Sequence, residues 1–167
     1  VVARLEELDL TPANYNGGGQ LVAAGSLPAL QALSAEPPAG TRVIPLQVAG
    51  AFHTRYMGSA VEALRQAAAA VRATDPAVTL WSNRDGASAT SGAEFVDSLV
   101  EQVASPVRWD LCMASFAAEG VTGIIEFSPA GTLTGLAKRA LRGVPSVAVK
   151  TPDDLAAAQA LVRGDAA

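Results

Sequence analysis

Residues 47–54 read Gln-Val-Ala-Gly-Ala-Phe-His-Thr, and the rest of the sequence is interpreted outward from them. An apolar pattern typical of a strand covers Arg42–Val48, and small residues follow it. Phe52 and His53 come next, and a helical pattern begins directly after them. A strand-to-helix junction lies at a sheet edge that substrates can reach, so His53 suits a general base. From position alone, a hydrogen-bonded structural histidine is the more common alternative.

The composition limits the class of protein. The chain has 167 residues, which fits one medium domain, or one small domain and part of another. Lys and Arg number 12 against 16 Asp and Glu, and this net charge of −4 argues against non-specific nucleic-acid binding. No apolar run has the length of a membrane span, and no signal peptide is visible.

The single cysteine and single histidine limit the chemistry further. Cys112 has no partner for an internal disulfide, and this predicts a reducing, cytoplasmic location. Its apolar helical neighbours favour a core thiol over a nucleophile. No metal site is expected, because one histidine without a Cys, Asp or Glu cluster does not make one.

Residues 1–48 predict most of a ferredoxin-like unit that lacks its first strand. A helix covers residues 1–8, and since it has neither an initiator methionine nor a cap, we expect the natural chain to extend upstream. A hairpin over residues 11–25 turns at Asn16–Gly19, whose glycines fit no phosphate-binding motif. A helix capped by Ser26 and the strand Arg42–Val48 complete the unit.

Helix and strand patterns alternate through the remaining residues and predict a parallel α/β sheet. The expected helices are 54–73, 91–103, 105–120, one that follows Gly131 and one that begins at Thr151, and the expected strands are 78–82, 121–127 and 146–149. The apolar residues expected to be buried are Met57, Val61, Leu64, Ala68 and Val71 on the first helix, Phe95, Leu99 and Val103 on the second, and Trp109, Cys112, Met113 and Phe116 on the third.

Five stretches together resemble the C-terminal half of the malonyl-CoA:acyl carrier protein transacylases, and their polyketide synthase relatives. These stretches are Pro12–Gly25, Val48–Thr54, Leu80–Asn83, Gln102–Trp109 and Glu126–Leu136. They occur in order, and the resemblance covers essentially the whole chain. It implies an α/β fold in which a ferredoxin-like small subdomain (1–48) joins part of an α/β-hydrolase-like large one (49–167). It also implies transfer of malonyl from coenzyme A, through a serine ester, to the phosphopantetheine thiol of acyl carrier protein, with no cofactor.

The resemblance also assigns roles to individual residues. It implies that His53 is the catalytic base and that the main-chain carbonyl of Gln102 orients it. Phe52 stands where a bulky aromatic accompanies malonyl preference over methylmalonyl, because the ring fills the space of an α-methyl group. Three polar residues match a segment near the family's active site, although turn-forming asparagine is the alternative for the first two. They are Asn14, Asn16 and Gln20.

The sequence lacks three features that the resemblance leads us to seek. No G-x-S-x-G occurs, and the nearest stretch, Gly86–Thr90, lacks the second glycine. A glycine–glutamine oxyanion motif and an arginine for the malonyl carboxylate are also absent. We therefore expect an upstream half to supply them and this chain alone to be inactive. A non-catalytic scaffold or partner that keeps the fold, and an acyltransferase domain fragment of a polyketide synthase, remain the alternatives.

A cluster of cations allows two interpretations. Lys138, Arg139 and Arg142 lie at the end of a predicted helix, where positive charge suits the helix dipole. The same residues also suit contacts with an acidic carrier protein or with coenzyme A phosphates.

Overall fold

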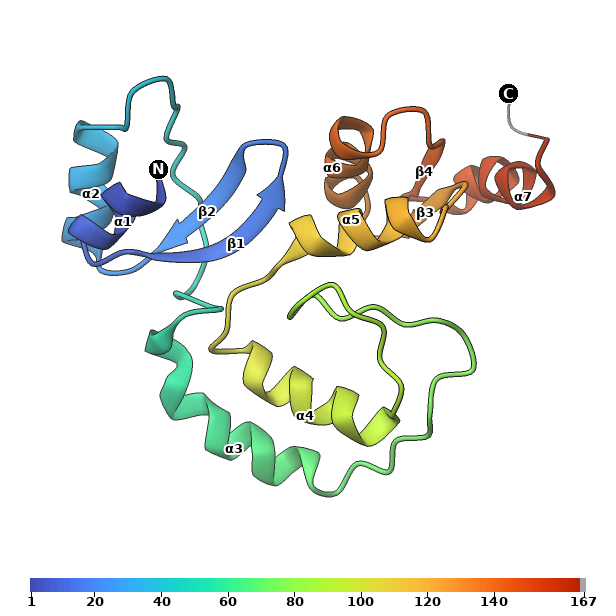
Figure 1. Cartoon of the computed structure of the whole chain (residues 1–167), viewed down its shortest axis with the longest axis horizontal. Coiled ribbons are helices and arrows are strands. Elements are labelled where there is room, and N and C mark those ends of the chain that lie inside the picture. The colour runs from blue at the N-terminus through green and yellow to red at the C-terminus, as the bar shows by residue number, and fades with distance from the viewer. Residues whose placement is uncertain (166–167) are drawn as a thin grey trace.

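The computed structural model describes residues 1–165, which form a mixture of short helices and strands (Figure 1). The helices are α1 (Val2–Glu7), α2 (Leu27–Ala35), α3 (Gly58–Ala68), α4 (Gly92–Gln102), α5 (Trp109–Ala118), α6 (Thr132–Ala140) and α7 (Leu155–Arg163), with 3₁₀ turns η1 (Arg55–Met57) and η2 (Pro152–Asp154). The strands are β1 (Thr11–Gly17), β2 (Gln20–Ala24), β3 (Ile124–Phe127) and β4 (Ser146–Val149).

Residues 1–35 fold as their sequence predicts, into a hairpin packed with two helices. β1 pairs antiparallel with β2, and Gly17, Gly18 and Gly19 all have the positive φ that the tight turn requires. The Ser26 hydroxyl accepts the Ala29 N–H and so caps α2. A small apolar core joins α1, α2 and the hairpin, and its buried members are Leu5, Leu10 and Leu33.

The strand predicted over Arg42–Val48 is wrong. The structure has no regular secondary structure there, although the alternating apolar pattern is present. Ile44, Leu46 and Val48 are 57%, 59% and 71% exposed. A strand needs a neighbouring strand for its backbone hydrogen bonds, and no described strand lies beside this segment.

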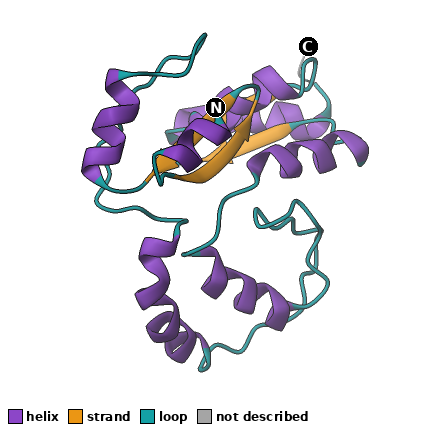
Figure 2. Cartoon of the chain, turned by 60° about the vertical axis from the view of Figure 1, so that its left-hand side comes forward, coloured by secondary structure: helices purple, strands orange, loops and turns teal. Residues whose placement is uncertain are grey.

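Helices α3 and α4 pack against each other below the rest of the molecule (Figures 1 and 2). The helix predicted to reach Ala73 ends instead at Ala68, so that prediction is wrong at its C-terminal end. The chain after it turns back toward the start of α4, where the Asp75 carboxylate accepts the Gly92 N–H. Ser91 also caps α4 through the Glu94 N–H, as its sequence predicts.

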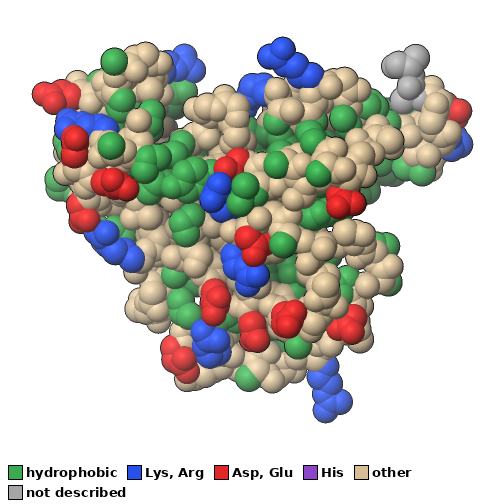
Figure 3. Space-filling view, in the orientation of Figure 1, with side chains coloured by type: hydrophobic (Ala, Val, Ile, Leu, Met, Phe, Trp, Pro, Cys, Tyr) green, Lys and Arg blue, Asp and Glu red, His purple; other side chains and the backbone are tan. Residues whose placement is uncertain are grey.

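The apolar stripes predicted for α3 and α4 are only partly buried. On α3, Val61 and Ala68 are half-buried and Leu64 is 40% exposed, while Val71 lies beyond the helix and is 58% exposed. On α4, Leu99 is half exposed and the buried residues are Gly92, Ser98, Val100 and Gln102. On α4 the inward face is polar because two of its side chains make hydrogen bonds there. The Ser98 hydroxyl accepts one from Arg84. The Gln102 amide donates to the Ser105 and Pro106 carbonyls. Acidic side chains, with a few basic ones among them, lie on the face of this part that Figure 3 shows.

The strand predicted over 78–82 is also wrong. Val78 is 78% exposed, and the segment forms only an isolated bridge between Trp81 and Ser88. Residues 83–86 form a turn. The Trp81 ring is held by a contact with α5, because it packs edge-on against Phe116 with a distance of 5.1 Å between the ring centroids.

The C-terminal elements form the second core. β3 and β4 pair in parallel, and α6 packs against both strands. Met113, Leu136, Ala137 and Leu141 are buried, with Trp109 and Phe116 packed against them, as the sequence predicts for α5. Strand β3 begins at Ile124 instead of Val121, and only Glu126 in it is buried. The predicted parallel sheet is therefore confirmed for one pair of strands.

A buried carboxylate ties β3 to the first turn of α6. Glu126 accepts the backbone N–H groups of Gly131, Leu133 and Thr134 and the Thr134 hydroxyl, at 2.8–3.0 Å. Burial alone would raise the pKa of this carboxyl. The hydrogen bonds from Thr134, Leu133 and Gly131 outweigh burial and lower the pKa to about 2, from an ordinary value of 4.5.

Replacing this carboxylate is expected to destabilise the chain in a pH-dependent way. Glu126→Gln should lower the free energy of unfolding by about 2 kcal/mol at pH 7, because the charged acceptor of the helix N-terminus is lost. A group with a lowered pKa stabilises the fold above its unfolded pKa, and that contribution fades as the pH falls from 4.5 toward 2. Urea unfolding at several pH values checks this, and a difference independent of pH would contradict it.

Candidate functional site

His53 lies in a loop between an irregular segment and η1, in an uncommon backbone conformation. Its φ is +63°, in the left-handed region that residues other than glycine rarely adopt. Its backbone N–H donates to the Val103 carbonyl just beyond α4, at 2.9 Å. This hydrogen bond holds the loop against the end of α4 and supports a backbone conformation of His53 that would be unfavourable without such contacts.

The imidazole makes a second contact with the same helix end. His53 Nδ1 lies 2.8 Å from the main-chain oxygen of Gln102, and the contact is half-buried. A carbonyl oxygen only accepts hydrogen bonds, so this contact requires the proton on Nδ1. In the neutral ring with this tautomer, the lone pair is on Nε2, and this nitrogen can accept a proton from a substrate or nucleophile.

Thr54 fixes the turn immediately after the imidazole. Its side chain is 1% exposed, and its hydroxyl donates to the Ala51 carbonyl at 2.6 Å. The same oxygen accepts the Tyr56 N–H and so caps η1. Sequence reasoning missed this residue, although a threonine directly before a helical pattern is the signal for a cap.

The segment from Gln102 to Arg108 connects the imidazole to the hairpin. Val107 pairs with β1 on both sides of Asn14, since it accepts the Tyr15 N–H and donates to Ala13. This pairing explains why α5 begins at Trp109 and not, as predicted, at Pro106. The Arg108 guanidinium lies over the Tyr15 ring, 4.8 Å from its centroid.

Arg108 also pairs with the first turn of α5. Two hydrogen bonds of 2.8–2.9 Å join it to Asp110. Hydrogen bonding to Arg108 holds the pKa of the Asp110 carboxyl below its ordinary value. The stacked ring and the ion pair together hold α5 beside β1.

The remaining predicted site residues differ in how far their side chains are exposed to solvent. Phe52, adjacent to His53, is 48% exposed. Asn14 and Asn16 are half-buried on β1, while Gln20 is exposed and accepts a hydrogen bond from Arg139 of α6. Among the described residues, no hydrogen bond joins Asn14, Asn16 or Gln20 to His53. The structure therefore brings Phe52, His53 and Gln102 together and leaves the other three on the hairpin.

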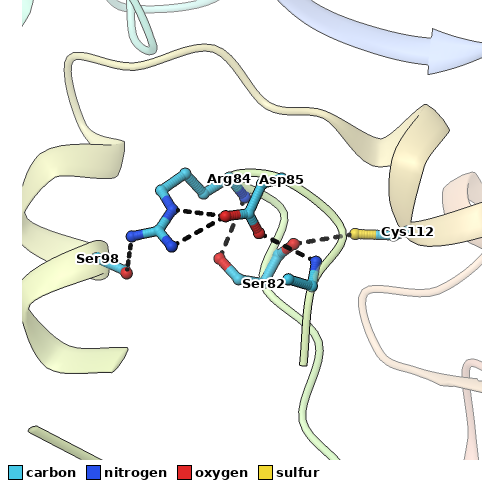
Figure 4. Close-up of polar contacts among 6 residues, drawn as sticks. Ser82, Arg84, Asp85, Ser98 and Cys112 are labelled. Atoms are coloured by element: carbon cyan, nitrogen blue, oxygen red, sulfur yellow. Dashed lines mark hydrogen bonds and ion pairs between the residues drawn. The ribbon is translucent and has the colours of Figure 1, made fainter. Parts of the chain in front are cut away.

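A polar network around the turn at residues 82–87 fixes α4 relative to α5 (Figure 4). Arg84 donates to the Ser98 hydroxyl of α4 at 2.7 Å and pairs with Asp85. On the other side, the Cys112 thiol of α5 points to the Ser82 carbonyl. Burial, with the nearby Asp85 charge, raises the pKa of this thiol to about 11. Cys112 is therefore protonated and packs as a core residue, as its sequence context predicts.

Two grooves flank β3, and neither is lined by His53. One of about 330 Å³ lies among α5, β3 and α6, and one of about 310 Å³ lies between β3 and α7. Within residues 1–165, no cluster of His, Cys, Asp and Glu has the arrangement of a metal site. None of the helices described here is both long and apolar enough to cross a membrane.

Comparison with known proteins identifies the family. The malonyl CoA-acyl carrier protein transacylase of Mycobacterium tuberculosis is 57% identical to this chain over 155 residues. The chain belongs to the malonyl CoA-acyl carrier protein transacylase family. The match covers 93% of this chain and 51% of the relative, so the chain spans about half the length of the curated relatives it matches. No protein-family model matches the sequence.

Solved structures of this family share the fold. The crystal structure of MCAT from M. tuberculosis superposes on this chain with a TM-score of 0.89. The match covers 93% of this chain and 51% of the M. tuberculosis chain. A type II polyketide synthase acyl-carrier protein in complex with its malonyl-transacylase gives a TM-score of 0.84 at 28% identity, over 93% of this chain and 52% of that one. The predicted family and its mixed α/β fold are therefore confirmed.

The Thr54 hydroxyl offers a test of how firmly the loop is held. Thr54→Val keeps the shape of the side chain but removes both hydrogen bonds, so we expect unfolding to be easier by about 1–2 kcal/mol. Thermal unfolding measures the loss. Thr41→Val is the matched control, since the Thr41 hydroxyl makes one bond to Pro38 on an exposed turn. If the two changes lowered the free energy of unfolding equally, the claim that the Thr54 hydroxyl holds this loop in place would be rejected.

Proposed function

We propose that this chain supplies the general base and part of the acyl pocket for malonyl transfer from coenzyme A to acyl carrier protein. The observation that carries the proposal is the 2.8 Å contact of His53 Nδ1 with the Gln102 carbonyl. It leaves Nε2 as the basic nitrogen of the ring. The nucleophile is a serine outside this sequence, since no G-x-S-x-G occurs within it.

In the first half of the reaction, His53 Nε2 takes the proton of the serine hydroxyl. The serine oxygen bonds to the thioester carbonyl carbon, the bond from that carbon to sulfur breaks, and coenzyme A leaves as a thiol after His53 returns the proton. The ring is positively charged in between. The carbonyls of Gln102 and Val103, at the negative end of α4, face His53 and stabilise that charge.

The second half reverses the first with a different thiol. The phosphopantetheine thiol of the carrier protein gives its proton to Nε2, and its sulfur bonds to the ester carbonyl carbon. The bond to the serine oxygen breaks, and that oxygen recovers the proton from His53. Support for a carrier protein as partner comes from a related malonyl-transacylase whose structure is a complex with a type II polyketide synthase acyl-carrier protein.

Phe52 is proposed to set the acyl preference. It precedes His53 directly, and its ring is half exposed and lies 3.5 Å from the point where a Cβ on Gly50 would stand. A bulky ring beside the base limits the space for a branch on the acyl α-carbon. Malonyl is therefore expected to be preferred over methylmalonyl, by an amount limited to about one methyl group, roughly 1–3 kcal/mol. Asn14, Asn16 and Gln20 are proposed to line the same pocket from the hairpin.

The two subdomains are also part of the proposal. We assign residues 1–48 to the ferredoxin-like small subdomain and 49–167 to the α/β-hydrolase-like large one. In support, the hairpin with α1 and α2 has its own core, separate from the core formed by α5 and α6.

Loss of the imidazole should abolish transfer. The test uses a chimera in which this chain replaces the matching 155 residues of the M. tuberculosis relative. His53→Ala is expected to lower the rate of malonyl transfer to carrier protein about 100- to 10,000-fold, the usual contribution of a general base. Transfer is followed by mass spectrometry of the carrier protein.

A second variant separates chemistry from folding. His53→Asn keeps a residue that tolerates positive φ, so it should preserve the loop and lose the same activity. This chain alone is expected to transfer no malonyl. A chimera with His53→Ala that kept its rate would remove His53 from the mechanism and favour the scaffold interpretation.

The pocket assignment predicts a change of selectivity. Phe52→Ser in the chimera should raise the kcat/KM ratio of methylmalonyl-CoA to malonyl-CoA about tenfold or more, because the ring no longer excludes the methyl group. Tyr56→Ser is the control, as Tyr56 is an exposed aromatic residue four positions after Phe52. An unchanged ratio in Phe52→Ser, or an equal change in Tyr56→Ser, would reject the steric account.

A further inference from the structure

We propose that the side-chain amide of Gln102 positions His53, by holding in place the main-chain carbonyl that orients the imidazole. This inference rests on the proposed role of His53 as base. It adds a side-chain function to a residue for which the resemblance implies only a main-chain role.

The amide of Gln102 bridges two carbonyls of the turn that follows α4. Its Nε2 donates to the Ser105 oxygen at 2.8 Å and to the Pro106 oxygen at 3.0 Å. Both partners are carbonyl oxygens, which only accept, so the NH₂ group must face them. The residue is 7% exposed, and water therefore does not easily replace these bonds.

The same turn is closed on its other side by the carbonyl that holds the imidazole. Gln102 O accepts the Ser105 N–H at 3.2 Å as well as His53 Nδ1. The next carbonyl, of Val103, accepts the His53 backbone N–H. The side chain and main chain of Gln102 thus fix one short loop, and this loop presents two adjacent acceptors to His53.

A main-chain acceptor needs such support more than a carboxylate would. A carboxylate offers two oxygens on a rotatable side chain, whereas a carbonyl points where its peptide plane points. These carbonyls lie at the C-terminal end of a helix, where no further helical N–H fixes them. A rotation of the peptide plane after Gln102 would move the acceptor away from Nδ1.

The cost of the arrangement is visible in the same side chain. Gln102 Oε1 is buried and has no hydrogen-bond partner among the described residues. A buried acceptor without a partner is unfavourable, and an apolar side chain of the same size would avoid it. The contribution of the Gln102 side chain therefore lies in the two hydrogen bonds that its NH₂ group donates and not in its packing.

The first test reads the tautomer of the imidazole, which a merely structural role would not change. His53 is the only histidine in the chain, so its ring nitrogens give unambiguous signals in ¹⁵N NMR. In the unmodified chain we expect the proton on Nδ1. Gln102→Met keeps the length of the side chain but removes the amide, and it should shift the ring toward the Nε2–H tautomer. Glu101→Gln, an exposed neighbour on α4, is the control and should leave the signals unchanged.

The second test is kinetic and uses the chimera, in which the longer relative supports the fold. Gln102→Met should lower kcat about 10- to 100-fold, as expected for a small misplacement of a catalytic group, and change KM for malonyl-CoA less than twofold. A kcat within twofold of the parent, with the proton still on Nδ1, would overturn the positioning role. If His53→Ala also left the rate unchanged, the proposed function itself would fail, so the two failures are distinguishable.

Discussion

The structure depends on the pairing of the C-terminal end of α4 with the loop that carries His53. Two carbonyls at that helix end, of Gln102 and Val103, accept the imidazole and the backbone N–H of the same residue. The Val103 oxygen would otherwise be an unsatisfied helix-terminal acceptor, whereas the Gln102 oxygen also accepts the Ser105 N–H. One pair of contacts therefore satisfies the helix, holds His53 at a positive φ and selects its tautomer.

This pairing can hold His53 only if α4 itself is fixed in place. Several hydrogen bonds from polar groups fix it. Asp75 and Ser91 hold its first turn, and Arg84 reaches Ser98 at its middle. The turn at residues 82–87 then joins α5 through Cys112 and Ser115. From α5 the connection passes to β1 by the pairing of Val107. Hydrogen bonds thus connect the loop of the imidazole, through α4 and α5, to the parts of the chain that contain the two apolar cores.

The sequence predicts those parts of this structure that depend on neighbours in the chain. The hairpin at Asn16–Gly19, the Ser26 and Ser91 caps, β4 and the buried face of α5 all follow from local patterns. The segments Arg42–Val48 and 78–82 have strand composition but no strand beside them. Composition measures how well a segment fits a sheet, and the partner strand decides whether it forms one.

In the site, too, the sequence indicates some residues, whereas others are recognised only from contacts in the structure. His53 stands out because it is unique, and the resemblance points to the Gln102 carbonyl. Neither signal indicates the hydrogen bonds of the Gln102 amide and of Thr54, because those contacts depend on turns whose geometry the sequence does not specify. In the proposed mechanism, the contacts that leave Nε2 of His53 as the basic nitrogen all lie inside this chain. The proposed serine nucleophile lies outside it. The two groups therefore place different demands on folding, because the base depends on α4 and the polar contacts that fix this helix, whereas the serine has to be brought to the base by other residues.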